Sequence, residues 1–135
     1  MSLLTIRRAF EKRLAAMVGA LPTAYENATF TPVVNAPYQR VNLLPATPGN
    51  EIMGDKAYFE NGLFQITALY PQGVGPAAAD AYAQSLRLHF KRGTTMTESG
   101  IDVVVTDTPR VAPPLADGDR YLIPISVPFQ AQILT

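Results

Sequence analysis

Residues 62–93 most constrain the fold of this chain, because they predict a strand, a turn and a helix in direct succession. Residues 63–70 alternate between apolar and mixed positions, which is typical of a strand with one buried face. Proline and glycine then dominate 71–76, which predicts a turn with Pro76 as the first helical residue. An apolar stripe at helical spacing follows and ends before Gly93, which indicates an amphipathic helix. The chain therefore combines sheet and helix.

Other segments have weaker but recognisable patterns. Apolar residues spaced three to four apart predict a helix over 2–19. Short apolar pieces between prolines predict strands near 28–34 and 38–44, followed by a long loop over 45–60. A β-branched run predicts a further strand over 101–106.

The last predicted strand, 121–133, has apolar residues at seven consecutive odd positions. Pro124 and Pro128 lie on its other face, and neither can donate an amide hydrogen to a neighbouring strand. Residues four apart present their amides to the same edge. We therefore predict that this segment is an edge strand or a bulged strand.

These elements predict one α+β domain over 1–135, because each helix and strand carries a single apolar face to bury. The expected architecture is a two-layer sandwich. A mixed or mostly antiparallel sheet of about four to six strands would have two helices packed on one face. With 47% hydrophobic residues the chain can build such a core.

The charge composition excludes several classes of partner. Eleven basic residues balance eleven acidic ones, whereas general nucleic-acid binders and membrane-surface proteins depend on an excess of positive charge. No apolar run is long enough to span a bilayer. We expect neither nucleic-acid recognition nor a membrane partner.

The sequence gives only weak support for a catalytic or ligand-binding site. His89 is the only histidine, and it fits the edge of a helical stripe as a partly buried, hydrogen-bonded side chain better than a general base. The glycines before Pro76 resemble a phosphate-binding loop, but the lysine of that motif is absent and Pro76 removes a donor. Asp117 and Asp119 do not have the spacing of a calcium loop. We expect no catalytic, cofactor or metal site.

Several short motifs are distributed along the sequence: Glu26-Asn27 before Phe30-Thr31-Pro32, Pro37-Tyr38-Gln39-Arg40-Val41, Leu44-Pro45-Ala46, Gly62-Leu63-Phe64-Gln65-Ile66, Tyr70-Pro71-Gln72-Gly73-Val74-Gly75, Phe90-Lys91-Arg92-Gly93, and Tyr121 with Pro124 and Val127. Through these motifs nearly the whole chain, from about residue 4 to 133, resembles a small phage protein family of unassigned function. The glycines and Pro71 of these motifs are expected to fix turns, so no binding role is transferred to them. The family is similar in length and layout to the tail terminator proteins of long-tailed phages.

That resemblance implies a structural role without catalysis. Tail terminators form a ring, typically of six subunits, on the head-proximal end of the tail tube. The ring stops polymerisation of the tube protein and presents a docking surface to the head–neck connector proteins. The implied partners are other copies of this chain, the tube protein and the neck. The protein would be assembled in the host bacterial cytoplasm and reside in the virion tail.

A ring requires two different complementary patches on each subunit. The basic face of the first predicted helix and the 45–60 loop are candidates for one patch, and the acidic loop 115–119 is a candidate for the other. The expected interface residues are Arg7, Arg8, Lys12, Ile52, Met53, Tyr58, Phe59, Asp117 and Asp119.

Two other hypotheses remain open at this point. The chain could be a different neck or head–tail connector protein of similar size, which would bind the portal or neck rather than tube ends. It could also be a small enzyme or ligand-binding domain, which would need convergent polar groups that the sequence does not reveal.

Overall fold

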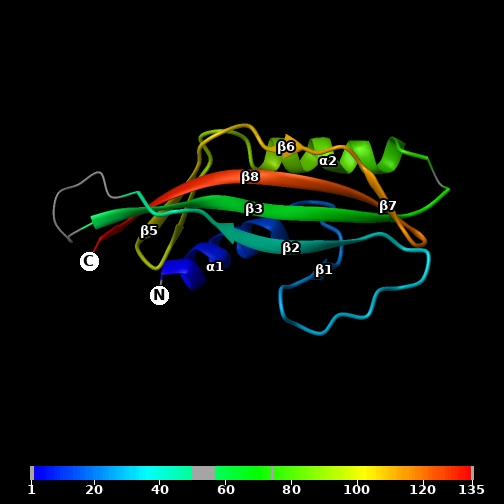
Figure 1. Ribbon diagram of the computed structural model, residues 1–135, viewed down its shortest axis with the longest axis horizontal. Coiled ribbons are helices and arrows are strands. Elements are labelled where there is room, and N and C mark those ends of the chain that lie inside the picture. The colour runs from blue at the N-terminus through cyan, green and yellow to red at the C-terminus, as the bar shows by residue number, and fades with distance from the viewer. Residues whose placement is uncertain (1, 50–56, 74, 135) are drawn as a thin grey trace.

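The computed structural model describes residues 2–49, 57–73 and 75–134. Two long strands form the spine of an elongated molecule, as Figure 1 shows. They are β3 (Ala57–Pro71) and β8 (Arg120–Leu134), which pair antiparallel from Ala57↔Leu134 to Pro71↔Arg120. The other elements are α1 (Ser2–Ala15), β1 (Thr23–Ala24), β2 (Tyr38–Pro45), α2 (Ala77–His89), β4 (Thr95–Glu98), β5 (Ile101–Val105), β6 (Arg110–Val111) and β7 (Leu115–Asp117).

The eight strands found among the described residues belong to one mixed sheet. Its order is β1-β2-β3-β8-β5-β4, and β6 and β7 also pair with β8. Among these pairs only β1 and β2 are parallel; the others are antiparallel. The predicted α+β class with a mostly antiparallel sheet is confirmed. The strand number exceeds the predicted four to six because β1, β6 and β7 are each only two or three residues long.

Phe10 of α1 lies at the centre of the core, which forms between the helices and one face of the sheet. Its ring stacks on Phe64 of β3 at 4.6 Å between centroids and meets Phe129 of β8 edge-on at 5.4 Å. Phe90, which caps the C-terminus of α2, lies 5.8 Å away. One ring therefore joins both helices to the two spine strands. The alternating apolar positions predicted for β3 and β8 make up this buried face.

The last strand is central, so the prediction of an edge strand is wrong. Its second edge pairs with β5, then β6, then β7. The carbonyl of Pro128 accepts from the amide of Thr106 at 3.1 Å, and the carbonyl of Pro124 accepts from Ala112 at 2.9 Å. A strand residue directs its nitrogen and its carbonyl to the same edge. The two missing donors therefore face the gaps where one short partner strand ends and the next begins.

Residues 28–34 are not a strand, contrary to the prediction. Pro32 cannot donate to a ladder, and Asn35 has a positive φ of 60° that turns the chain into β2. Arg120 holds this loop, because its guanidinium donates to the carbonyls of Val33 and Ala36. Sequence patterns also missed β1, which pairs with β2 only at Thr23↔Gln39 and Ala24↔Arg40.

The strand predicted over 63–70 begins earlier, at Ala57, so the end of the predicted 45–60 loop is strand. Gly62, expected in a turn, lies within β3 opposite Phe129 and beside Pro45 of β2. The first helix is shorter than the predicted 2–19 and ends at Ala15.

A buried polar group joins α2 to β2 and the β1 segment. The hydroxyl of Tyr82 donates to Oε1 of Gln39 and accepts from the amide of Leu21 at 3.2 Å. Nε2 of Gln39 donates to Oγ1 of Thr23 at 2.9 Å. Burial raises the pKa of Tyr82 to about 12, so this hydroxyl stays protonated and keeps its donor role.

Candidate assembly surfaces

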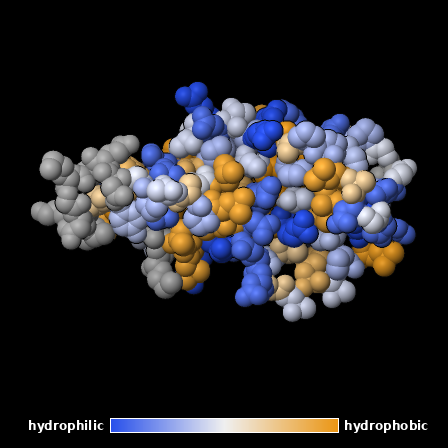
Figure 2. Space-filling model, in the orientation of Figure 1, coloured by the Kyte–Doolittle hydropathy of each residue, from blue (hydrophilic) through white to orange (hydrophobic). Residues whose placement is uncertain are grey.

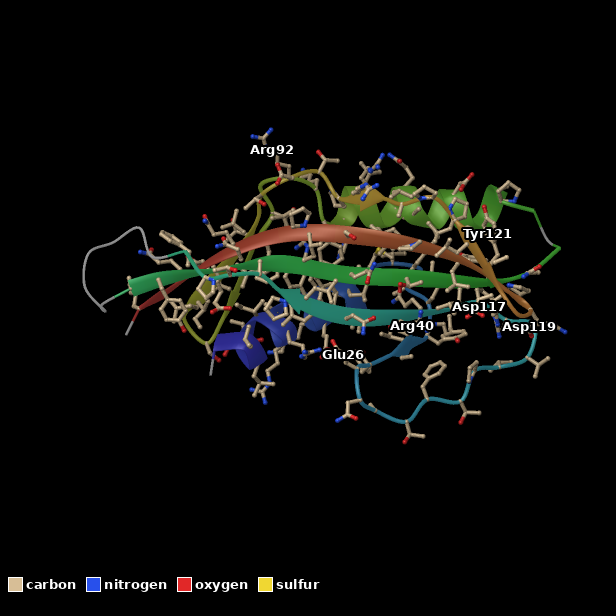
Figure 3. All side chains as sticks on the ribbon, in the orientation of Figure 1. Glu26, Arg40, Arg92, Asp117, Asp119 and Tyr121 are labelled. Atoms are coloured by element: carbon tan, nitrogen blue, oxygen red, sulfur yellow. The ribbon has the colours of Figure 1, made fainter. Side chains whose placement is uncertain are left out.

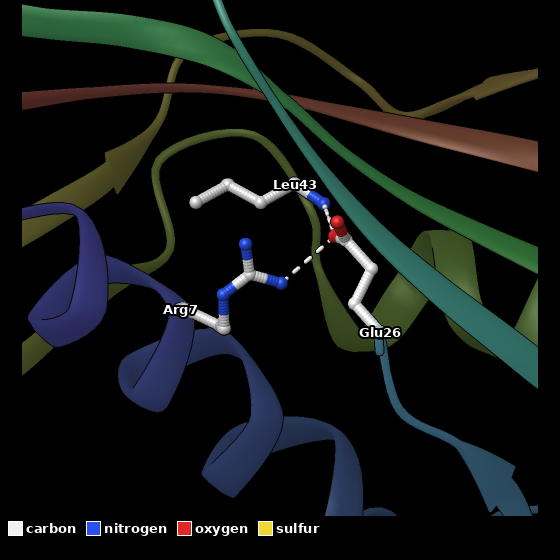
Figure 4. Close-up of polar contacts among 3 residues, drawn as sticks. All are labelled: Arg7, Glu26 and Leu43. Atoms are coloured by element: carbon white, nitrogen blue, oxygen red, sulfur yellow. Dashed lines mark hydrogen bonds and ion pairs between the residues drawn. The ribbon is translucent and has the colours of Figure 1, made fainter. Parts of the chain in front are cut away.

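The basic residues of α1 are largely engaged within the chain. Nη1 of Arg7 lies 2.8 Å from Oε1 of Glu26, and Nζ of Lys12 lies 2.6 Å from Oε2 of Glu98. Figure 4 shows that the same Glu26 oxygen accepts from the amide of Leu43, at 2.8 Å. Arg8 is exposed. Two of the three charges predicted to face a neighbour thus tie α1 to its own sheet.

The Glu26 carboxylate holds the helix, a loop and a strand together. The hydrogen bond from Arg7, followed by that from the Leu43 amide, lowers the pKa of Glu26 below its ordinary value of 4.5. Glu11, on the same helix as Arg7, behaves in the opposite way. Burial raises the pKa of Glu11, and the Arg7 charge lowers it by less.

These opposite shifts predict opposite pH effects on stability. A lowered folded pKa means that Glu26 stabilises the fold above its unfolded pKa, and that this contribution is lost as the pH falls through the folded value. We expect Glu26→Gln to lower the melting temperature near neutral pH, and we expect its difference from wild type to shrink as the pH falls below the ordinary pKa of a glutamate. The effect corresponds to about 1 kcal/mol or less, because the pair is partly exposed and screened.

Glu11→Gln is the matched control for this measurement. Its raised pKa makes the charged form unfavourable in the fold, so wild type gains on this variant as the pH falls. Thermal denaturation of wild type and both variants across the acid range tests the pair. A wild-type advantage over Glu26→Gln that grows towards acid pH would contradict the assignment.

The structure describes two of the four apolar candidates from the predicted 45–60 loop. Ile52 and Met53 lie outside the described residues. Tyr58 and Phe59 belong to β3 and are half-buried. Tyr58 packs against the core, while the backbone of Phe59 exchanges hydrogen bonds with Gly49 at 2.8 and 2.9 Å. Both described residues have a structural role that the loop prediction did not anticipate.

Asp117 and Asp119 flank Gly118 in the turn that joins β7 to β8, and both are exposed. Gly118 has a φ of 61°, a conformation that suits glycine. Gln72 fixes the turn, because its side-chain amide donates to the carbonyls of Gly118 and Arg120 at 2.8 and 3.1 Å. The two carboxylates therefore occupy a fixed tip at one end of the long axis, as Figure 3 shows.

A second exposed basic segment follows α2. Lys91 and Arg92 are exposed, and Figure 3 places Arg92 far from Asp117 and Asp119. The sequence contains a signal for this segment, since two cations precede Gly93. Cations at this position also complement the negative end of the helix dipole.

His89 is half-buried and hydrogen-bonded, as predicted, and it also connects the two helices. Its Nε2 lies 2.7 Å from the carbonyl oxygen of Arg13, while the Arg13 guanidinium donates to the carbonyl of His89 at 2.9 and 3.1 Å. Within the described parts of the chain, no group of three or more His, Asp or Glu residues is arranged to hold a metal ion.

The surface is a mosaic of small patches. Figure 2 shows several apolar patches separated by polar residues on the face in view. No described helix is long and apolar enough to cross a membrane. Contacts on such a surface combine apolar anchors with charges that set their orientation.

The comparisons identify the family. The model of the phage tail terminator protein family matches residues 5–129. This chain belongs to the phage tail terminator family. It is also similar to a solved structure at 32% sequence identity, with a TM-score of 0.78, over 100% of this chain and 99% of the other. No curated protein matches the chain. Membership assigns this tail terminator family protein a structural role in phage tail assembly.

Proposed function

We propose that this tail terminator family protein assembles into a ring, typically of six copies, on the head-proximal end of the tail tube. The ring stops addition of tube subunits and offers the opposite surface to the head–neck connector proteins. It forms in the host bacterial cytoplasm, remains in the virion tail and performs no catalysis. The family match over residues 5–129 carries this proposal.

The shape and the surface support a role in assembly. A single core joins both helices to the spine strands, so the described elements pack as one unit. Exposed charges of opposite sign occur at separate places, at Asp117 and Asp119 and at Lys91 and Arg92. Separate complementary patches are what a closed ring of identical subunits needs.

Tube length gives the functional test. Tube protein polymerised with this chain should yield shorter tubes than tube protein alone, with a ring visible at one end by negative-stain electron microscopy. Tubes of unchanged length with bare ends would contradict termination. Binding to purified portal or neck complexes, together with bare tube ends, would instead favour a connector role.

A further inference from the structure

A pocket lies at the N-terminal end of α2, beside the acidic turn. Its volume is about 360 Å³. Its lining is mostly apolar and comes from the end of β3, the following turn, the N-cap of α2, β7 and β8. The described lining residues are Pro71, Gln72, Gly73, Gly75, Pro76, Ala116 and Tyr121. A cavity of this size can accept one aliphatic side chain with its flanking backbone.

Two residues next to the lining of this pocket carry exposed carboxylates. Asp117 directly follows Ala116, and the backbone carbonyl of Asp119 accepts from the backbone amide of Gln72 at 2.9 Å. Both Ala116 and Gln72 line the pocket. The site is thus an apolar depression whose lining residues neighbour two acidic residues.

The other end of α2 carries the complementary features. Leu88 lies in the last turn of the helix and is 64% exposed, on the side that faces away from the buried Leu86. Lys91 and Arg92 follow within four residues and are also exposed. An exposed leucine alone is ordinary. Here it stands beside two cations. The leucine suits the apolar pocket, and the cations complement the two acidic residues next to it.

One copy cannot join its own two ends. The helix between them has 13 residues, which places the ends about 20 Å apart at about 1.5 Å per residue. Figure 3 likewise separates Arg92 from Asp117 and Asp119 along the molecule. Two different patches on one chain that complement each other give head-to-tail contacts, which close into a ring when the rotation allows.

We infer that neighbouring copies of this chain join head to tail along α2, with Leu88 of one copy in the pocket of the next. Lys91 and Arg92 of the first copy then face Asp117 and Asp119 of the second. The apolar anchor excludes water at the centre, while the charges fix orientation and speed encounter. This inference rests on the proposed ring and names the surfaces that form it.

A charge exchange tests the pairing. The variants are Lys91→Glu with Arg92→Glu, Asp117→Lys with Asp119→Lys, and the combination of all four. Sedimentation velocity of the full chain, alone and with tail tubes, gives the concentration at half assembly. We expect either double reversal to raise this concentration at least about tenfold, since like charges then oppose each other. The combined variant should recover most of the loss.

Controls separate this contact from general effects. Arg40→Glu with Arg110→Glu changes the net charge as much as Lys91→Glu with Arg92→Glu, at two exposed positions outside the predicted interface, and should leave assembly unchanged. Leu88→Asp should weaken assembly, whereas its thermal stability should match wild type because the side chain is exposed.

The outcomes distinguish the inference from the proposed function. If wild type forms rings but the combined variant recovers no assembly, the charge pairing is wrong and the proposed ring still holds. Equal loss in the Arg40 and Arg110 control would also overturn it, since net charge alone would then explain the result. A wild-type chain that forms no ring, alone or on tube ends, would overturn both.

Discussion

Replacing Phe10 by alanine is expected to lower the free energy of unfolding by about 3–5 kcal/mol. The side chain is fully buried, and its ring contacts those of Phe64, Phe90 and Phe129. Removing it leaves a cavity where both helices meet the sheet, and three rings lose a neighbour at once. Domains of this size are stable by only about 5–15 kcal/mol, so the loss is a large share of the total.

Phe30→Ala provides the matched control for Phe10→Ala. Phe30 is half-buried on the loop before β2 and stacks on Tyr38 at 5.2 Å. Its removal should cost only about 0.5–1.5 kcal/mol. Urea denaturation followed by far-UV circular dichroism measures both variants. Equal losses for Phe10→Ala and Phe30→Ala would show that the four-ring contact is not the centre of the core.

Gly62→Ala is expected to lower the free energy of unfolding by about 1–3 kcal/mol. A Cβ atom at this position would collide with the carbonyl oxygen of Leu44, and it would lie 3.1 Å from Cα of Pro45 and 3.2 Å from the Phe129 ring. The first two contacts are backbone, so β2 would have to move away from β3. The third would press on the Phe129 ring, which contacts Phe10, so the disturbance would reach the core.

Gly49→Ala tests whether this loss is specific to the close approach at Gly62. Gly49 lies in the connection between β2 and β3, and a Cβ there would meet Asn61 at 3.5 Å and Phe59 at 3.6 Å, which are ordinary contacts. We expect a change within about 0.5 kcal/mol. Chemical denaturation of both variants and wild type measures the two changes in the free energy of unfolding. A tolerated Gly62→Ala would mean that the strands separate there at little cost.

The elements with a regular apolar period were predictable from the sequence. The helix before Gly93 and the strand over 121–133 appear where the patterns placed them. Periodicity reports which face of an element is buried, so it identified the core residues of both. It does not report which strand lies alongside another. The role of Pro124 and Pro128 was therefore misjudged, because their effect depends on which strands pair with β8.

The candidate interface was less accessible to sequence reasoning for a similar reason. The local sequence around a charged residue on a helix does not show whether its partner lies in the same chain or on another subunit. Only the fold shows that Arg7 and Lys12 meet Glu26 and Glu98. The sequence favoured α1 as the basic surface, and the structure shows a second exposed basic segment after α2.

The sequence by itself determined the α+β class, the two amphipathic helices and the resemblance to phage tail terminators, because these depend on local period and on motif order. Only the tertiary structure decided that β8 is central, that Gly62 must lack a side chain, and which charges remain exposed. Each of these depends on contacts between residues far apart in the chain, such as Arg7 with Glu26. Such contacts are set by packing, which no local pattern encodes.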